Sequence, residues 1–212
     1  MKKDNFRMEQ SKPMKNYIAE TAGKLFIEKG TTAVTYEDIA KAAGCSRTTV
    51  YSYFAAKEDI INYIVLSAFS HIRMIMQKIT KQPLRADEQL RLLSYELISF
   101  CEEKPFYYKC MLENIDASPE GRKKNPLLED IYNLGEQLNE YFTGIITLGI
   151  SQGIFREDLK SRPAGLILWS FLTSLVGLMR NKKDYIESDI LPMQDFLEYG
   201  FRMLLRIVMK EV

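Results

Sequence analysis

The sequence predicts an all-α protein of about nine helices, in which an N-terminal helix-turn-helix domain precedes a larger helical domain. Apolar residues recur at helical spacing along the chain, and no segment shows the alternation expected of a strand. Proline, glycine and polar clusters interrupt this pattern and separate successive helices. With 212 residues, 46% of them apolar, the chain can bury one sizeable core and a small appended domain without disulfides or metals.

The first helix is expected between Ser11 and Gly30. Ile18, Ala22 and Phe26 recur on one face of it, so this helix has an apolar side to pack. Gly30 is a typical residue just beyond a helix C-terminus, where the backbone turns left-handed.

The segment from Thr35 to Phe54 predicts two short helices joined by a tight turn. Thr35 is a good N-cap residue, and Asp38 three positions later is a weak capping-box partner. Gly44 can supply the positive φ that ends the first helix, and Ser46 can cap the second. The spacing therefore predicts a helix-turn-helix.

The second of these helices has an inner and an outer face. Val50 points back at Ile39 and Ala43 of the first helix. The outer face combines hydroxyls, a guanidinium and phenols, supplied by Arg47, Thr48, Thr49, Tyr51, Ser52 and Tyr53. Such a surface suits the phosphates and base edges of a DNA major groove. A purely structural hairpin remains an alternative on these residues alone, because such hairpins occur in many all-α proteins.

A longer set of fixed positions surrounds this motif. A helix ends in Phe-x-x-x-Gly and is followed by Thr-x-x-x-Ile-Ala-x-x-Ala-Gly-x-Ser-x-x-Thr-x-Tyr-x-x-Phe-x-x-Lys-Glu. The matching positions are Phe26, Gly30, Thr35, Ile39, Ala40, Ala43, Gly44, Ser46, Thr49, Tyr51, Phe54, Lys57 and Glu58. In this pattern the chain resembles the TetR family of bacterial transcription regulators. The resemblance implies a DNA-binding domain over residues 12–72, with its helix-turn-helix at 35–54, and a regulatory ligand-binding and dimerisation domain over residues 73–212.

The resemblance also implies which residues contact DNA. The expected DNA-binding residues are Thr35, Tyr36, Ser46, Arg47, Thr48, Thr49, Tyr51, Ser52, Tyr53 and Lys57. Among them Thr35, Tyr53 and Lys57 are expected at phosphates, whereas Val50 and Phe54 are expected in the core. A fourth helix is expected over the long amphipathic segment 62–80, which joins directly to the residues after Phe54. Ala56 departs from the family pattern, because a capping Ser, Asn or Asp often precedes the lysine, and this weakens the start of the fourth helix by about 1 kcal/mol.

Charge is unevenly distributed along the chain. Residues 1–57 contain ten Lys or Arg against six Asp or Glu, whereas the other 155 residues contain 19 against 22. The net charge of the whole chain is only +1. This asymmetry favours a nucleic-acid contact near the N-terminus and a nearly neutral body.

Composition argues against an enzyme or a metalloprotein. The sequence has no Gly-rich phosphate loop, no Gly-x-Ser-x-Gly elbow and only one histidine, His71. Cys45, Cys101 and Cys110 lack zinc-ligand spacing, and isolated thiols are more often buried and inert than part of a redox switch. We therefore expect no cofactor and no metal, and a reduced, cytoplasmic setting without a signal peptide or membrane contact.

Beyond the first domain the pattern predicts five more helical segments. They are residues 87–102, 105–115, 127–152, 164–181 and 193–210. The polar run at 118–126 and the segment 182–192 are expected to be breaks.

The last two segments are the expected dimer interface. Residues 165–179 are apolar nearly all round but fall short of the roughly 18 to 20 residues of a membrane span. A helix of this kind needs cover on two sides, and a partner's helices can supply one of them. The expected interface residues are Leu168, Phe171, Leu172, Leu175, Phe196, Gly200, Phe201 and Leu204. A monomer is the alternative, although a single recognition helix binds DNA poorly without a two-fold partner.

Aromatic and Met side chains between the two ends of the chain predict a ligand pocket. The expected lining is Tyr95, Phe100, Tyr107, Tyr108, Met111, Tyr132, Tyr141 and Trp169. Such residues can enclose an apolar or aromatic small molecule, although residues at this spacing are also typical of an ordinary core.

These expectations together describe a homodimeric regulator, most simply a repressor, that binds a palindromic double-stranded DNA operator and is released by a small-molecule effector. The alternative is a TetR-fold interaction module or an activator with reduced DNA reading. The regulator is favoured by the intact Thr35, Ser46, Thr49, Tyr51, Tyr53 and Lys57. Neither the operator nor the effector follows from the sequence.

Overall fold

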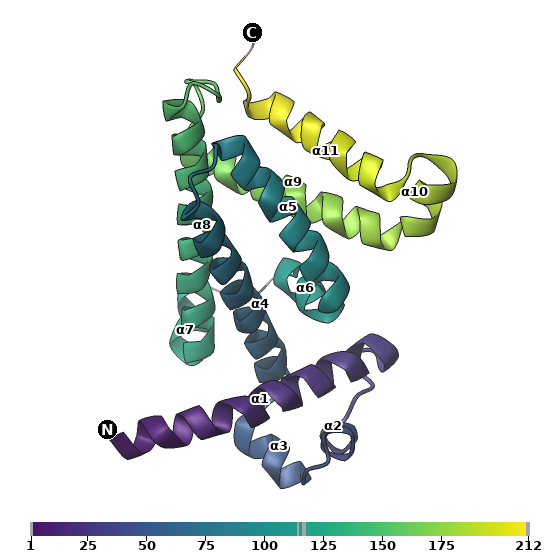
Figure 1. Cartoon of the computed structure of the whole chain (residues 1–212). Helices are drawn as coiled ribbons and strands as arrows, with labels where there is room; N and C mark the ends of the chain where they lie inside the picture. The colour runs from purple at the N-terminus through teal and green to yellow at the C-terminus, as the bar shows by residue number, and fades with distance from the viewer. Residues whose placement is uncertain (1, 114, 116–117, 211–212) are drawn as a thin grey trace. The chain divides into compact units, whose positions relative to one another are not determined.

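The computed structural model describes residues 2–113, 115 and 118–210, with side chains from residue 13 onward. These residues form eleven helices and no named strand (Figure 1). The helices are α1 (Lys2–Lys29), α2 (Tyr36–Ala43), α3 (Arg47–Tyr53), α4 (Lys57–Thr80), α5 (Ala86–Glu103), α6 (Pro105–Leu112), α7 (Pro119–Lys124), α8 (Pro126–Ser151), α9 (Ser161–Asn181), α10 (Lys183–Asp189) and α11 (Met193–Val208). The predicted all-α class is therefore confirmed.

The chain forms two compact units. Unit 1 comprises Met1–Ala68 and Phe106–Ile131, and unit 2 comprises Phe69–Pro105 and Tyr132–Val212. Unit 1 thus contains α1 to α3, the first half of α4, α6 apart from its first residue, α7 and the start of α8. The division at residues 72 and 73 that the resemblance implies stays a prediction.

The two helices beyond the expected nine lie inside the two expected breaks. At α7, the Ser118 hydroxyl accepts a hydrogen bond from the Gly121 N–H at 3.1 Å, and Pro119 occupies the first turn, where its missing N–H costs nothing. At α10, Ile186 is buried and anchors the turn. Polar composition concealed both helices, because short helices depend on caps and single anchors rather than on a long apolar stripe. The first helix also begins earlier than expected, at Lys2.

Unit 1 is held by a core that joins α1 to the helix-turn-helix. Ile18, Val50 and Ile64 are fully buried. The Lys15 ammonium lies 5.2 Å from the ring centroid of Phe54 and 4.6 Å from that of Tyr63, which adds a cation–π contact at its edge. These contacts hold α3 by its inner face and leave its outer face open.

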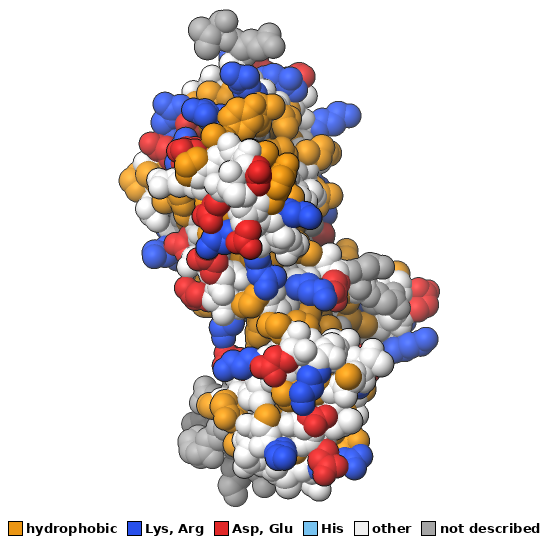
Figure 2. Space-filling model, turned by 90° about the vertical axis from the view of Figure 1, so that its right-hand side faces the viewer, with side chains coloured by type: hydrophobic (Ala, Val, Ile, Leu, Met, Phe, Trp, Pro, Cys, Tyr) orange, Lys and Arg blue, Asp and Glu red, His pale blue; other side chains and the backbone are white. Residues whose placement is uncertain are grey.

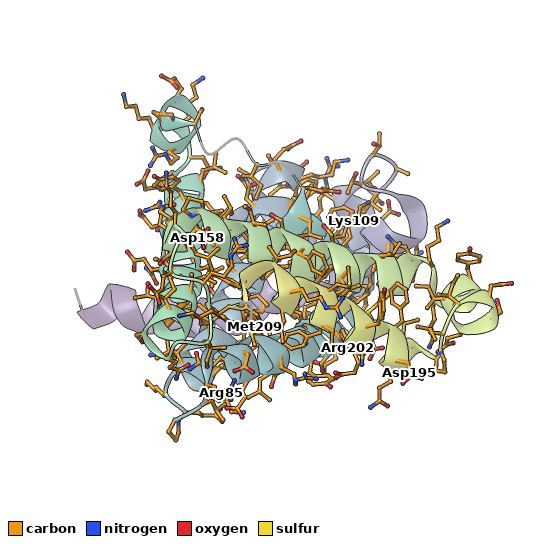
Figure 3. The ribbon with its side chains drawn as sticks, turned by 90° about the horizontal axis from the view of Figure 1, so that it is seen from above. Arg85, Lys109, Asp158, Asp195, Arg202 and Met209 are labelled. Carbon is orange, nitrogen blue, oxygen red and sulfur yellow. The ribbon has the colours of Figure 1, made fainter. Side chains whose placement is uncertain are left out.

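Unit 2 brings α9 and α11 side by side (Figures 1 and 3). Gly200 of α11 is buried against α9, and a Cβ there would lie 2.7 Å from Leu175 Cδ2. By length and composition α9 is apolar enough to cross a membrane, but seven of its residues are buried in the unit. They are Gly165, Leu168, Leu172, Thr173, Leu175, Val176 and Met179. Its apolar character therefore serves the core of unit 2.

Candidate nucleic-acid interface and regulatory surfaces

The start of α2 carries a complete capping box. The Thr35 hydroxyl accepts from the Asp38 N–H at 3.2 Å, while the Asp38 carboxylate accepts from the Thr35 N–H at 2.9 Å and from the Thr35 hydroxyl at 2.7 Å. These hydrogen bonds lower the pKa of Asp38. The box is thus stronger than the sequence indicated, and both Thr35 donors are already used within it.

The turn between α2 and α3 depends on Gly44. Its φ of 65° and ψ of 30° place it in the left-handed region, where a side chain would be strained. The next N–H, that of Cys45, reaches the Ala40 carbonyl at 3.0 Å and closes the end of α2. Cys45 itself is half-buried.

Ser46 begins α3. Its hydroxyl accepts from the Thr49 N–H at 3.0 Å and lies 2.8 Å from the Thr49 hydroxyl. Val50 has no exposed surface and anchors the helix, whereas Arg47, Thr48 and Tyr51 are exposed. The two faces that the spacing predicts for α3 are therefore present.

Tyr36 joins α2 to the end of α3. Its ring stacks on that of Tyr51, with centroids 4.2 Å apart and planes 2° from parallel, and its hydroxyl donates to the Phe54 carbonyl at 3.1 Å. Burial raises the pKa of this hydroxyl to about 12, with a smaller contribution from Tyr51. Arg47 completes the group, since its guanidinium donates to the Tyr51 hydroxyl at 3.2 Å.

Lys57 has a structural partner that the sequence did not reveal. Its ammonium donates to the backbone carbonyls of Thr31, Thr32 and Val34, at 3.0, 3.3 and 3.1 Å. An ammonium has three protons, so these bonds can use all of them. The phosphate contact expected of Lys57 stays a prediction and would require at least one of these bonds to break.

The start of α4 replaces its missing cap in another way. The Asp59 carboxylate accepts from the Ala56 N–H at 3.0 Å, which is the second half of a capping box. An acidic residue three positions after Ala56, the residue that precedes the helix, was a signal for this in the sequence. The departure at Ala56 is thus partly compensated.

Most of the expected dimer residues lie inside the protomer. Leu168, Leu172, Leu175, Gly200, Phe201 and Leu204 are buried, and only Phe171 and Phe196 are half-buried. A helix that is apolar all round has two candidate faces, and its spacing cannot show which one packs on its own core. The large apolar side chains that α9 and α11 expose are Leu166, Ile167, Leu178, Tyr199, Met203 and Ile207. Figure 2 shows hydrophobic side chains exposed among charged ones in its upper part.

The expected pocket residues divide between the two units. Tyr107, Tyr108 and Met111 are buried in unit 1, while the other five belong to unit 2. Tyr95 is exposed and donates its hydroxyl to Glu198, His71 stacks on Phe100, and Trp169 contacts Phe142.

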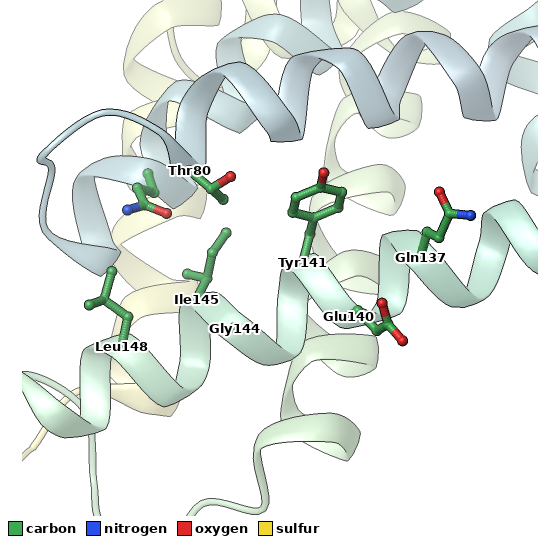
Figure 4. A pocket seen from close by; sticks show the side chains of 8 residues that line it. Thr80, Gln137, Glu140, Tyr141, Gly144, Ile145 and Leu148 are labelled. Carbon is green, nitrogen blue, oxygen red and sulfur yellow. The ribbon is translucent and has the colours of Figure 1, made fainter.

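Unit 2 contains a cavity of about 510 Å³ between the end of α4, the start of α5 and α8 (Figure 4). It is lined by Thr80, Gln89, Gln137, Glu140, Tyr141, Gly144, Ile145 and Leu148. Of these, only Tyr141 belongs to the expected lining, which consists of aromatic and Met side chains. Positions 137, 140, 141, 144, 145 and 148 share one face of α8, and this helical spacing is the signal in the sequence for the α8 side of the cavity.

The cysteines are buried or half-buried thiols. Burial raises the pKa of Cys110 to about 12 and also raises that of Cys101. Such thiols are poor nucleophiles. Among the residues that the structure describes, no group of three His, Cys, Asp or Glu side chains could hold a metal.

The fold and the capped α2–α3 pair define a helix-turn-helix DNA-binding protein with an added helical domain. A family profile described as bacterial regulatory proteins of the tetR family matches residues 18–64. HTH-type transcriptional repressor KstR2 of Mycobacterium tuberculosis is 27% identical over 146 residues, covering 67% of this chain and 69% of that protein. The fatty acid metabolism regulator protein of Bacillus subtilis is 27% identical over 171 residues, covering 80% and 84%.

Solved structures agree with these sequence relatives. The TetR family transcriptional regulator PfmR of Thermus thermophilus matches with a TM-score of 0.68 and 28% identity, over 89% of this chain and 97% of that one. The fatty acid degradation regulator FadR of Bacillus halodurans has a TM-score of 0.72 at 18% identity, over 91% and 95%, and supports the fold. Residues 18–64 thus match the DNA-binding region of the tetR family, and the chain as a whole is similar in sequence and fold to TetR family transcriptional regulators.

Proposed function

We propose that this regulator is a homodimeric, cytoplasmic repressor that binds a palindromic operator and is released by a small-molecule effector. The observation that carries the DNA-binding part is the outer face of α3, which is capped, anchored by Val50 and open to solvent. Repression is supported by relatives that are named as a transcriptional repressor and as a negative transcriptional regulator.

In this proposal α3 of each protomer enters a major groove, with half-sites about 34 Å or slightly more apart. Phosphate contacts make affinity depend on salt, since each neutralised phosphate releases counterions and contributes about 0.9 to the magnitude of the slope of log K against log salt concentration. Exposed Thr48 and half-buried Tyr53 supply donors for these contacts more directly than Thr35 or Lys57, whose protons already have partners.

The test is a mobility shift with palindromic DNA from around the protein's own gene, at two salt concentrations. Thr48→Glu places a negative charge on the outer face of α3 and should weaken binding at least tenfold. Gln77→Glu adds the same charge at an exposed position of α4 in unit 2 and serves as the control. Equal binding by both variants would refute this interface, and failure to select any sequence from random DNA would favour the interaction-module alternative.

We propose that the dimer forms through the exposed side chains of α9 and α11 rather than through the buried ones. Tyr199, Met203 and Ile207 recur every four residues and so form one stripe on α11. Ile167→Glu and Met203→Glu should each give monomers by light scattering, because a carboxylate would be desolvated on both sides of the two-fold axis. Met74→Glu, at an exposed apolar residue of α4, should leave the dimer intact.

We propose that the effector occupies the cavity at the end of α4. Thr80, the last residue of α4, lines the cavity, and the same helix starts just after α3, so a ligand at Thr80 contacts an element that reaches the DNA-binding unit. The ligand can release DNA only to the extent that it binds the two conformations differently. The lining includes the Glu140 carboxylate and no Lys or Arg, so a neutral or cationic apolar molecule fits better than a fatty acid anion.

Small molecules should be screened for those that both raise the melting temperature of the protein and release it from the operator. Because nothing lies within 4 Å of a Cβ at Gly144, Gly144→Phe should place its ring in the cavity and abolish both effects. Release that is unaffected in this variant would exclude the cavity as the effector site.

A further inference from the structure

We propose that Arg47 reads a guanine in each half-site and that the stacked rings of Tyr36 and Tyr51 hold Arg47 in position to do so. This inference rests on the proposed function, since it requires α3 to enter the major groove. It also changes the expected role of Tyr36, which becomes a positioning residue instead of a DNA contact.

The stack joins three points of the helix-turn-helix. Tyr36 comes from α2, Tyr51 from the last part of α3, and the Tyr36 hydroxyl is fixed to the Phe54 carbonyl just beyond α3. A ring held at both its face and its hydroxyl has few other orientations. Tyr51 is 43% exposed, but one face of its ring is covered by the fixed ring of Tyr36.

Arg47 packs against the Tyr51 ring of this stacked pair. Its guanidinium carbon lies 5.4 Å from the Tyr51 ring centroid, and one nitrogen donates to the Tyr51 hydroxyl. Arg47 and Tyr51 are four residues apart, so they share one face of α3. The guanidinium group of arginine commonly packs on the faces of aromatic rings. This contact limits the rotamers of an otherwise flexible side chain.

The position of Arg47 favours reading a base. It is the first residue of α3, and recognition helices present their N-terminal residues to base edges. Only one of the five guanidinium donors has a partner in this contact, so a pair remains for the O6 and N7 acceptors of guanine. A side chain that is already ordered loses less entropy when it binds, which strengthens a geometrically demanding contact more than a loose phosphate contact.

The test begins with the operator that the wild-type protein selects from random DNA. Binding is then measured to that operator and to versions with each base pair of one half-site replaced. We expect one guanine whose replacement weakens wild-type binding roughly 5- to 150-fold, the range of a bidentate arginine–guanine pair. In Arg47→Ala this position should accept all four bases, whereas the other positions keep their preferences.

Conservative variants separate positioning from stability. Tyr36→Phe keeps the stack and should keep the guanine preference. Tyr36→Leu loses the stack and should relax the preference at that one position, an effect that a general loss of stability does not produce. Should Tyr36→Leu fail to fold, Tyr51→Leu tests the same stack from its exposed member.

The outcomes distinguish this inference from the proposed function. If the wild type selects no sequence, the proposed function fails and the inference fails with it. If Arg47→Ala weakens binding equally on all sequences and lowers the salt slope by about 0.9, Arg47 contacts a phosphate and the inference is overturned while the function stands. If Arg47→Ala relaxes the position but neither stack variant does, the positioning role of Tyr36 is overturned.

Discussion

Replacing Gly149 by alanine should destabilise unit 2, although alanine is the better helix former. A Cβ at Gly149 would lie 2.1 Å from Phe155 Cδ2 and 2.4 Å from Cε2, and Phe155 is fully buried. Because the ring is enclosed by the protein, any shift of the ring displaces its neighbours. The consequence reaches α11, because Phe155 pairs with Met209 and the neighbouring Arg156 N–H donates to the Val208 carbonyl at 2.9 Å.

The magnitude follows from two opposing terms. Overpacking of this kind costs about 3 kcal/mol, at the upper end of its usual range, because three ring atoms are overlapped. Replacing a glycine inside a helix by alanine raises the free energy of unfolding by about 1 kcal/mol. The net loss of about 2 kcal/mol corresponds to a fall in melting temperature of about 4–8 °C for a chain of this size.

The assay is thermal unfolding followed by circular dichroism, with Gly144→Ala as the matched control. Gly144 lies on the same helix, and a Cβ there meets nothing within 4 Å, so this variant should be more stable by about 1 kcal/mol. In a Phe155→Leu background the Gly149→Ala change should cost much less. A Gly149→Ala protein as stable as the wild type, or an undiminished cost in the Phe155→Leu background, would refute the reasoning.

Two further predictions concern charged residues. Lys57→Gln should lower the melting temperature, because three backbone carbonyls lose the ammonium that donates to them. The same variant should leave the salt dependence of DNA binding unchanged. A salt slope smaller by about 0.9 would show instead that Lys57 binds a phosphate. Hydrogen bonds from Tyr95 and Arg91 lower the pKa of Glu198 from its ordinary value of 4.5. Because the folded pKa is the lower one, this stabilisation is present above pH 4.5 and is lost as the pH falls below it. Glu198→Gln should therefore reduce the loss of stability that occurs as the pH falls below 4.5. An unchanged loss in this variant would exclude Glu198 as one of its causes.

The helix-turn-helix could be read from the sequence because its signals are local. Thr35, Gly44 and Ser46 act on backbone within a few residues of themselves, so their spacing alone predicts the caps and the turn that the structure contains. The inner and outer faces of α3 follow from helical geometry in the same way.

The remaining site depended on contacts between distant segments. Lys57 reaches carbonyls more than twenty residues earlier, and the Tyr36 hydroxyl reaches Phe54, neither of which leaves a periodic signal. The cavity lies between three helices and is lined mostly by residues that are not aromatic.

The sequence by itself determined the all-α class, the caps and turn of the helix-turn-helix and the two apolar C-terminal helices. Only the tertiary structure decided which face of each helix is buried. Leu172 and Leu204 pack inside the protomer, while Ile167 and Met203 face outward. Helical periodicity specifies that residues share a face, but the neighbour that covers this face is specified by packing across the whole unit.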